Sequence, residues 1–273
     1  MKSLLSAFRA LPAALWPLLC VATIVLSGCS SNPAVTAGPS EADKLLLDRG
    51  NDGLKERRWS TARQYFSELL ESYPQSPLRA EAKLGLGDSY LGENNSASYV
   101  YAQNEYREFL AFYPTNPRAD YAQMQLGMVH FSQMLNPQRD QTETKEAIKE
   151  FNTFLERYPN SPLLPEVKQR LRDSMDRLSD WDVQVGNFYL SIRLYAGAEQ
   201  RYRHVLQLDP GYTRRDSLYF HLAEALEKSD RKAEALPYYE RLVSEYEQSE
   251  YLEEATRRIQ LLKEALKSTS VGL

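Results

Sequence analysis

The sequence predicts an all-α protein, built as an array of about five helix pairs, and three features lead to that prediction. One pattern recurs five times: a small residue, an aromatic residue and an aliphatic pair at helical spacing. Proline-bearing connectors follow several of the copies, and a long stretch almost without glycine or proline separates the third copy from the fourth. The composition, 42% apolar and 26% charged, is that of an ordinary globular protein.

Each copy of the pattern defines one amphipathic helix. Its positions fall on one face of an α-helix, which a lone helix cannot bury but a stack of helices can. The alanines of successive copies lie 37 to 51 residues apart. The copies are Ala62/Phe66/Leu69/Leu70/Tyr73, Ala102/Tyr106/Phe109/Leu110/Tyr113, Ala147/Phe151/Phe154/Leu155/Tyr158, Ala198/Tyr202/Val205/Leu206 and Ala235/Tyr239/Leu242/Val243/Tyr246. Such an array favours a binding scaffold over an enzyme.

The connectors predict where helices end and begin. Three copies end in Tyr-Pro, followed by Ser or Asn and a second proline, over residues 73–77, 113–117 and 158–162. Proline cannot continue a helix, so each helix should end at the tyrosine. The Ser or Asn should then cap the next helix, and the second proline should lie in its first turn.

Shorter turns are expected within the helix pairs, near residues 57–59, 94–98, 136–144 and 229–232. The third of these is the longest, so the third repeat should carry an inserted loop.

Between Leu163 and Ser191 the only glycine is Gly186 and the only proline is Pro165. The apolar residues keep a helical period throughout, which predicts one helix of about 28 residues. This helix would join two lobes, an N-terminal lobe over residues 41–160 with repeats one to three and a C-terminal lobe over residues 161–268. The second lobe would contain the long helix, repeats four and five and a capping helix over residues 251–266.

The N-terminus has the layout of an export signal. Lys2 and Arg9 precede an uncharged, largely apolar stretch that runs to Gly28. A single membrane-spanning anchor is the alternative. The segment Leu26-Ser27-Gly28-Cys29 resembles the bacterial lipobox, which would make residues 1–28 a lipoprotein signal peptide and Cys29 the lipidated first residue of the mature chain.

The lipobox resemblance also implies a location. Two or three acyl chains, palmitate among them, anchor a protein stably, whereas one binds only reversibly. Ser30, rather than aspartate, follows the cysteine, and by resemblance to enterobacterial sorting this favours the outer membrane. Residues 29–40 are small, uncharged and contain proline and glycine, which is typical of a flexible tether. The folded part would then lie at the periplasmic face of the outer membrane.

Charge and cysteine content exclude several other classes. A net charge of -4 gives no electrostatic basis for binding nucleic acid. Cys20 and Cys29 are the only cysteines, so the folded part has no disulfide framework.

No motif indicates catalysis or a cofactor. Gly85-x-Gly87 lies within a repeat helix with no strand before it, unlike a phosphate-binding loop. The histidines are far apart in sequence and lack the spacing of metal ligands, so no metal site is expected. They are His130, His204 and His221. The sequence therefore predicts a protein that is not an enzyme.

The repeat resembles the tetratricopeptide repeat. More narrowly, residues 41–230 resemble the lipoproteins of the bacterial outer-membrane β-barrel assembly machinery. Four features carry this resemblance: the lipobox with its tether, the first repeat, the inserted loop and the end of the long helix. In residues, the last three are Gly53-x5-Trp59-x2-Ala62-x3-Phe66-x6-Tyr73-Pro74-x-Ser76-Pro77, then Arg139-Asp140-Gln141-Thr142, then Asn187-Phe188-Tyr189 with Tyr195-x2-Ala198-x2-Arg201.

The resemblance implies a division of labour between the lobes. The N-terminal repeats would receive the C-terminal signals of unfolded outer-membrane proteins, and the C-terminal repeats would hold the periplasmic domain of the barrel insertase. Arg201 stands at the matching position of the insertase-contacting helix, and Tyr189 and Tyr195 are further candidates for that contact. Accessory lipoproteins are possible additional partners. Arg193-Leu194-Tyr195 departs from the usual spacing of the family, so this turn can differ by a residue.

Other interpretations remain open at this point. Arg201 can simply pair with Glu199 or another nearby acid. The chain can also be another periplasmic tetratricopeptide lipoprotein, acting in cell-division coordination, pilus assembly or the activation of cell-wall synthases.

Overall fold

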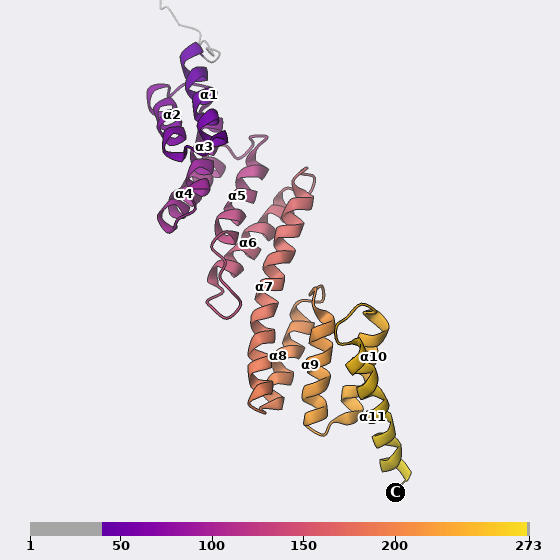
Figure 1. The fold of residues 1–273 in the computed structure, drawn as a ribbon. Helices are drawn as coiled ribbons and strands as arrows, with labels where there is room; N and C mark the ends of the chain where they lie inside the picture. The colour runs from indigo at the N-terminus through magenta and orange to yellow at the C-terminus, as the bar shows by residue number, and fades with distance from the viewer. Residues whose placement is uncertain (1–39, 272–273) are drawn as a thin grey trace, which may run out of the picture. The chain divides into compact units, whose positions relative to one another are not determined.

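The structure is a computed structural model that describes residues 40–271. Over these residues it contains eleven α-helices and no strand, which confirms the all-α prediction (Figure 1). The predicted signal peptide, the lipidation site Cys29 and nearly all of the predicted tether lie outside the described residues. Among the helices that are described, none is both long and apolar enough to cross a membrane.

The helices form five consecutive antiparallel pairs with an eleventh helix after them, and each helix packs against the next one along the chain. The helices are α1 (Glu41–Lys55), α2 (Trp59–Ser72), α3 (Arg79–Glu93), α4 (Ser96–Phe112), α5 (Ala119–Phe131), α6 (Thr142–Arg157), α7 (Leu164–Ser191), α8 (Tyr195–Leu208), α9 (Arg215–Lys228), α10 (Lys232–Glu245) and α11 (Leu252–Val271). The predicted long helix is confirmed, since α7 has 28 residues. The division into two lobes stays a prediction.

The repeated alanines and aromatics form the seams between helices. The first alanine and the following aromatic of all five copies are fully buried. In four of the five copies the aromatic ring lies against a glycine of the preceding helix, whereas α9, which precedes the fifth copy, contains no glycine. A Cβ on Gly127 would lie 2.3 Å from Cε1 of Phe151, and one on Gly186 would lie 2.5 Å from Cε1 of Tyr202. Glycine is needed at these places because the ring occupies the space of a side chain.

The connectors confirm the helix ends but not the helix starts. Three helices end directly before Tyr73, Tyr113 and Tyr158, as predicted. The predicted caps are wrong, because the next helices begin three residues after the Ser or Asn, with no side-chain cap. At residue 161, for example, the hydroxyl of Ser161 accepts a hydrogen bond from the Leu163 amide within the turn (3.1 Å). The same hydroxyl donates to Asp120 (2.6 Å) and so ties the connector to the previous helix pair.

The inserted loop occupies residues 132–141 and therefore begins earlier than the sequence indicates. Gln141 is buried and holds the loop together, because its amide donates to the carbonyl oxygens of Asn136 and Arg139, both at 3.0 Å. The side-chain oxygen of Gln141 accepts from Thr144 at the start of α6 (2.8 Å).

Candidate partner-binding surface

Arg201 lies on α8 and faces the neighbouring helix α7. Its guanidinium group donates to Asp182 (3.1 Å) and lies over the ring of Trp181, 5.7 Å from the ring centroid. The side chain keeps 35% of its surface exposed. The acidic partner is therefore Asp182, whereas Glu199, named in the sequence analysis, pairs with Arg203 and Arg231 instead. The guanidinium group of Arg201 is thus held by one hydrogen bond and one ring contact, and its other N–H groups stay available for a partner.

Asp182 is buried and is shared by two basic groups. One carboxylate oxygen contacts Arg201, and the other lies 2.9 Å from Nδ1 of His204. A carboxylate with two partners fixes the positions of both, because movement of either side chain breaks a charge-assisted hydrogen bond. Arg201 and His204 are consequently presented side by side on α8.

An apolar hollow of about 450 Å³ adjoins this pair between α6, α7 and α8. Trp181 and Asp182 belong to its wall, together with Leu178 and His204, and Leu208 at its rim is 66% exposed. A second hollow of about 540 Å³ lies on the other side of Trp181, between α7 and the inserted loop. A charged group beside an apolar hollow is the usual arrangement of a protein-binding hot spot. We call the residues Trp181, Asp182, Arg201, His204 and Leu208 the α7–α8 surface.

Tyr189 and Tyr195 lie beyond this surface, toward the turn between α7 and α8. Tyr189 lines the second hollow, whereas Tyr195 lines a separate, more polar hollow of about 700 Å³ with His221 and Lys228. The structure thus places the three sequence candidates on consecutive helices but not in one pocket.

The turn itself is exposed and apolar. Phe188 is 58%, Ile192 48% and Leu194 54% exposed, an uncommon density of large apolar side chains at one helix end. Arg193 has a left-handed conformation (φ 63°), and the Leu194 amide donates to the carbonyl oxygen of Tyr189 (2.9 Å). Arg57 and Asp230 occupy the same place in two other turns of this chain, with the same hydrogen-bond pattern. The expected difference from the family's spacing at this turn stays a prediction.

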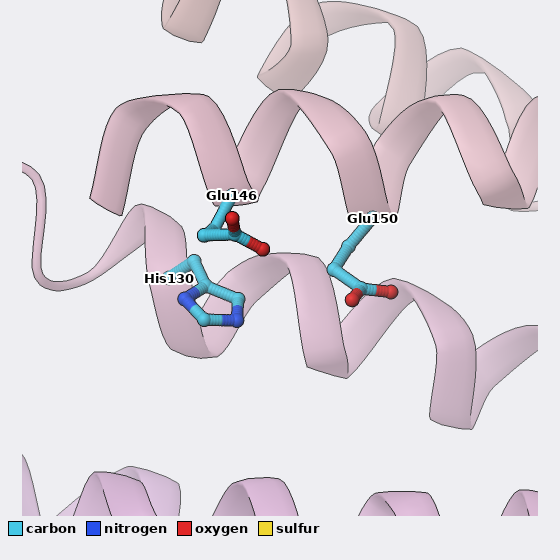
Figure 2. Close-up of side chains that lie close together, drawn as sticks. All are labelled: His130, Glu146 and Glu150. Atoms are coloured by element: carbon cyan, nitrogen blue, oxygen red, sulfur yellow. The ribbon is translucent and has the colours of Figure 1, made fainter. Parts of the chain in front are cut away.

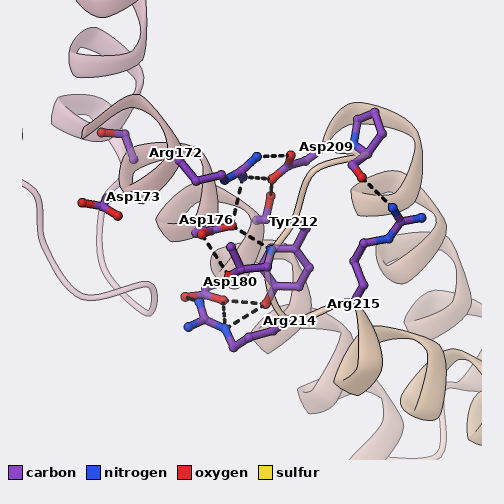
Figure 3. A network of polar contacts seen from close by, with 12 residues as sticks. Arg172, Asp173, Asp176, Asp180, Asp209, Tyr212, Arg214 and Arg215 are labelled. Carbon is purple, nitrogen blue, oxygen red and sulfur yellow. Dashed lines mark hydrogen bonds and ion pairs between the residues drawn. The ribbon is translucent and has the colours of Figure 1, made fainter. Parts of the chain in front are cut away.

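A polar network fixes α7 against the connector that follows α8 (Figure 3). Arg172 on α7 makes a two-pronged contact with the buried carboxylate of Asp209, one prong at 2.8 Å. Asp180 accepts from Tyr212 (2.6 Å) and pairs with Arg214. Burial, followed by the hydrogen bond to Asp180, raises the pKa of the Tyr212 hydroxyl above its ordinary value. These contacts make α7 and α8 a rigid support for the α7–α8 surface.

The N-terminal helices carry a different feature, a stack of one exposed and two partly buried side chains, in which Arg63 also pairs with Glu93 (2.9 Å). The rings of Tyr90 and Tyr101 stack with centroids 5.1 Å apart, and the guanidinium of Arg63 lies 4.9 Å from the centroid of Tyr90. Tyr101 is exposed, whereas Tyr99 is buried in the seam. Stacked aromatics with a cation can hold an aromatic side chain and a carboxylate of a ligand.

Sequence reasoning missed the central residues of the α7–α8 surface. In the sequence, Trp181 is simply one of the apolar positions that give the long helix its period, and Asp182 belongs to no motif. The signal that could have found them is a Trp-Asp pair on one helix that faces an arginine on the next.

Comparison with known proteins supports the tetratricopeptide fold and a family. The model of the YfiO family, described as outer membrane lipoprotein, matches residues 39–232, and a tetratricopeptide-repeat model matches residues 217–249. The outer membrane protein assembly factor BamD of Caulobacter vibrioides is 26% identical over 182 residues, which cover 67% of this chain and 59% of that protein. BamD of Vibrio cholerae is 26% identical over 200 residues, which cover 70% of this chain and 81% of that protein.

Solved structures with a similar arrangement include tetratricopeptide proteins. The TPR2AB domain of yeast Sti1, in complex with a pHSP90, matches with a TM-score of 0.42 and 13% identity, over 84% of this chain and 86% of that one. The Pseudomonas aeruginosa pilF protein matches with a TM-score of 0.38 and 18% identity, over 85% and 94%. Likenesses at this level carry no argument about function.

The helix pairs, their small-residue seams and the repeat match define a tetratricopeptide-type helical repeat protein. The family match covers more than half of the sequence. The chain belongs to the YfiO family of outer membrane lipoproteins.

Proposed function

We propose that this chain is a lipid-anchored periplasmic scaffold of the outer-membrane β-barrel assembly machinery. The family match over residues 39–232 is the observation that carries the proposal, and relatives in several bacteria are named outer membrane protein assembly factors. Acyl chains on Cys29 would hold the repeats at the periplasmic face of the outer membrane. Confinement to that surface raises the effective concentration of the scaffold near its partners.

The α7–α8 surface would bind the periplasmic domain of the barrel insertase. Arg201 is oriented by Asp182 and keeps donors free for a bidentate contact with a partner carboxylate. The adjoining apolar hollow suits an aliphatic or aromatic side chain of the same partner. The exposed turn with Phe188 and Ile192, next to Tyr189 and Tyr195, would extend the contact.

The stack of Arg63, Tyr90 and Tyr101 would receive segments of unfolded outer-membrane proteins. Such segments present alternating aromatic side chains, and a free C-terminus adds a carboxylate. The scaffold needs no catalytic group for this work, because barrel folding is driven by burial and strand pairing.

A pull-down from membranes of the native cell tests the proposal. The tagged chain, extracted in mild detergent, should recover a large outer-membrane barrel protein, and Arg201→Glu should reduce that recovery at least tenfold. Arg201→Gln separates loss of the contact from repulsion by Asp182, and Arg257→Glu on α11 is a matched control because Arg257 is likewise paired with a helix carboxylate. Recovery of division, pilus or cell-wall synthesis proteins without a barrel protein would contradict the proposal.

A further inference from the structure

Three side chains with metal-ligating atoms meet between α5 and α6, away from the α7–α8 surface. His130 comes from α5, and Glu146 and Glu150 come from α6 (Figure 2). One ligand atom of each residue lies within 4.8 Å of those of the other two. The helices, rather than a sequence motif, create this juxtaposition, because the histidine and the glutamates belong to different elements.

His130 is held as metal-binding histidines are held. Only 7% of the residue is exposed, and its Nδ1 lies 2.7 Å from a carboxylate oxygen of Glu143. A carboxylate on one ring nitrogen keeps the proton there, so that the other nitrogen, Nε2, carries the lone pair that a metal would take. Glu143 therefore has the position of an orienting residue for His130.

A fourth donor comes from α4. The amide of Gln103 lies 2.8 Å from Nε2 of His130. This amide donates to the lone pair of Nε2. Rotation of the amide by half a turn presents its carbonyl oxygen instead, which is a ligand rather than a competitor.

The carboxylates of Glu146 and Glu150 lie close together on one face of α6. Glu146 and Glu150 are one helical turn apart on the same face of α6, where like charges repel. Lys149 pairs with Glu146 at 3.0 Å on the exposed side, and Glu150 accepts a hydrogen bond from the neutral amide of Gln123 (2.7 Å). A cation bound between the carboxylates of Glu146 and Glu150 would be attracted by both of them.

We propose that His130, Glu146 and Glu150 bind one divalent transition-metal ion of the Zn²⁺ type, with Glu143 as a positioning residue. One imidazole and two carboxylates suit Zn²⁺ better than Mg²⁺ or Ca²⁺, which take oxygen ligands alone. Metal-ligand distances of about 2.0–2.2 Å put neighbouring ligand atoms about 3.4 Å apart. The ligand atoms, which lie within 4.8 Å of one another, must therefore approach by up to about 1.4 Å, and the two partly exposed glutamates have the freedom to do so.

The bound ion would stabilise the inserted loop of the third repeat. That loop begins two residues after His130 and ends one residue before α6, on which the glutamates lie. A metal across α5 and α6 fixes both ends of the loop at once. Pro137 and Gln138 of this loop line the hollow beside Trp181, so the ion would also order one wall of that hollow.

Calorimetric titration of the full chain with ZnCl₂ tests the site. The protein is kept in detergent with Cys20 and Cys29 replaced by serine and carries a tag without histidine, so that no thiol or tag binds the ion. We expect one Zn²⁺ per chain, a rise in Tm with Zn²⁺, and no such rise with MgCl₂.

Three substitutions decide the assignment. Glu150→Gln should weaken Zn²⁺ binding at least tenfold, and Glu143→Gln should weaken it about 10- to 100-fold, the usual effect of removing an orienting carboxylate. His221→Gln is the matched control, because His221 also contacts a carboxylate, that of Glu224, and it should leave the affinity and stoichiometry of Zn²⁺ binding unchanged.

None of these variants changes His130, which is buried, so the test does not depend on a substitution that would itself unfold the protein. Absence of a Zn²⁺-dependent rise in Tm, unchanged affinity in Glu150→Gln, or loss of binding in His221→Gln would each overturn the proposal.

Discussion

The seam between α5 and α6 allows a sharp test of how this array is held together. A methyl group added at Gly127 would lie 2.3 Å from Cε1 and 2.5 Å from Cδ1 of Phe151, far inside van der Waals contact. Phe151 is fully buried and makes an edge contact with Phe131, so its ring has no free space to enter. Gly127→Ala should therefore force the two helices apart.

The expected cost follows from two opposing terms. Overpacking of a tight core costs about 1–3 kcal/mol, whereas alanine is favoured over glycine in a helix by about 1 kcal/mol. The net loss in unfolding free energy should be about 0–2 kcal/mol, which corresponds to a fall in Tm of up to about 8 °C for a chain of this size. Gly197→Ala is the matched control, because its added methyl group would lie 3.1 Å from the nearest atom of Tyr189 and should cost less.

A double-mutant cycle identifies the cause. Phe151→Leu shortens the ring and makes room, so Gly127→Ala should cost at least about 1 kcal/mol less in that background than alone. Urea unfolding followed by circular dichroism measures all four variants. Additive effects within about 0.5 kcal/mol, or a stabilising Gly127→Ala, would refute the assignment of glycine to ring clearance.

Three further predictions concern other parts of the chain. The hydrogen bond from His221 is the main cause that lowers the pKa of Glu224 to about 2, so this carboxylate contributes stability that is complete above about pH 4.5 and lost as the pH falls toward 2. Glu224→Gln should lose at most about 3 kcal/mol at pH 7 and less than about 0.5 kcal/mol at pH 2, as measured by unfolding at a series of pH values. Asp209→Ala should cost about 3 kcal/mol, because Arg172 would lose a buried partner, and hydrogen exchange should rise in the connector after α8. Arg193→Gly should raise the unfolding free energy by about 0.5–1 kcal/mol, since glycine adopts its left-handed conformation without strain; a lower Tm would contradict this.

The sequence predicts most of the fold because helical periodicity and proline positions are local signals. The five stripes, the helix ends at Tyr73, Tyr113 and Tyr158, and the length of α7 all follow from it. The starts of the following helices cannot be predicted in this way. The Ser and Asn side chains accept hydrogen bonds within the connecting turn, and the local sequence pattern of such a turn is the same as that of a helix cap. Ser161, for instance, also bonds Asp120, a partner 41 residues away.

The residues of the candidate partner-binding surface are harder to predict because their arrangement depends on which helix faces meet. Arg201 is found by resemblance, but its partners Trp181 and Asp182 become apparent only when α7 and α8 are paired. The cluster of His130 with Glu146 and Glu150 is missed for the same reason, since spacing within one segment says nothing about donors on two helices.

Site-specific photo-crosslinking in the native cell tests the central proposal most directly. A photoreactive phenylalanine at position 208, at the exposed rim of the α7–α8 surface, should capture a large outer-membrane barrel protein, and Arg201→Glu should abolish that product. The same probe at position 261 on α11, where Leu261 is similarly exposed, is the control and should not give this product. Capture of the barrel protein from position 261 but not from position 208 would contradict the assignment of the α7–α8 surface to the insertase.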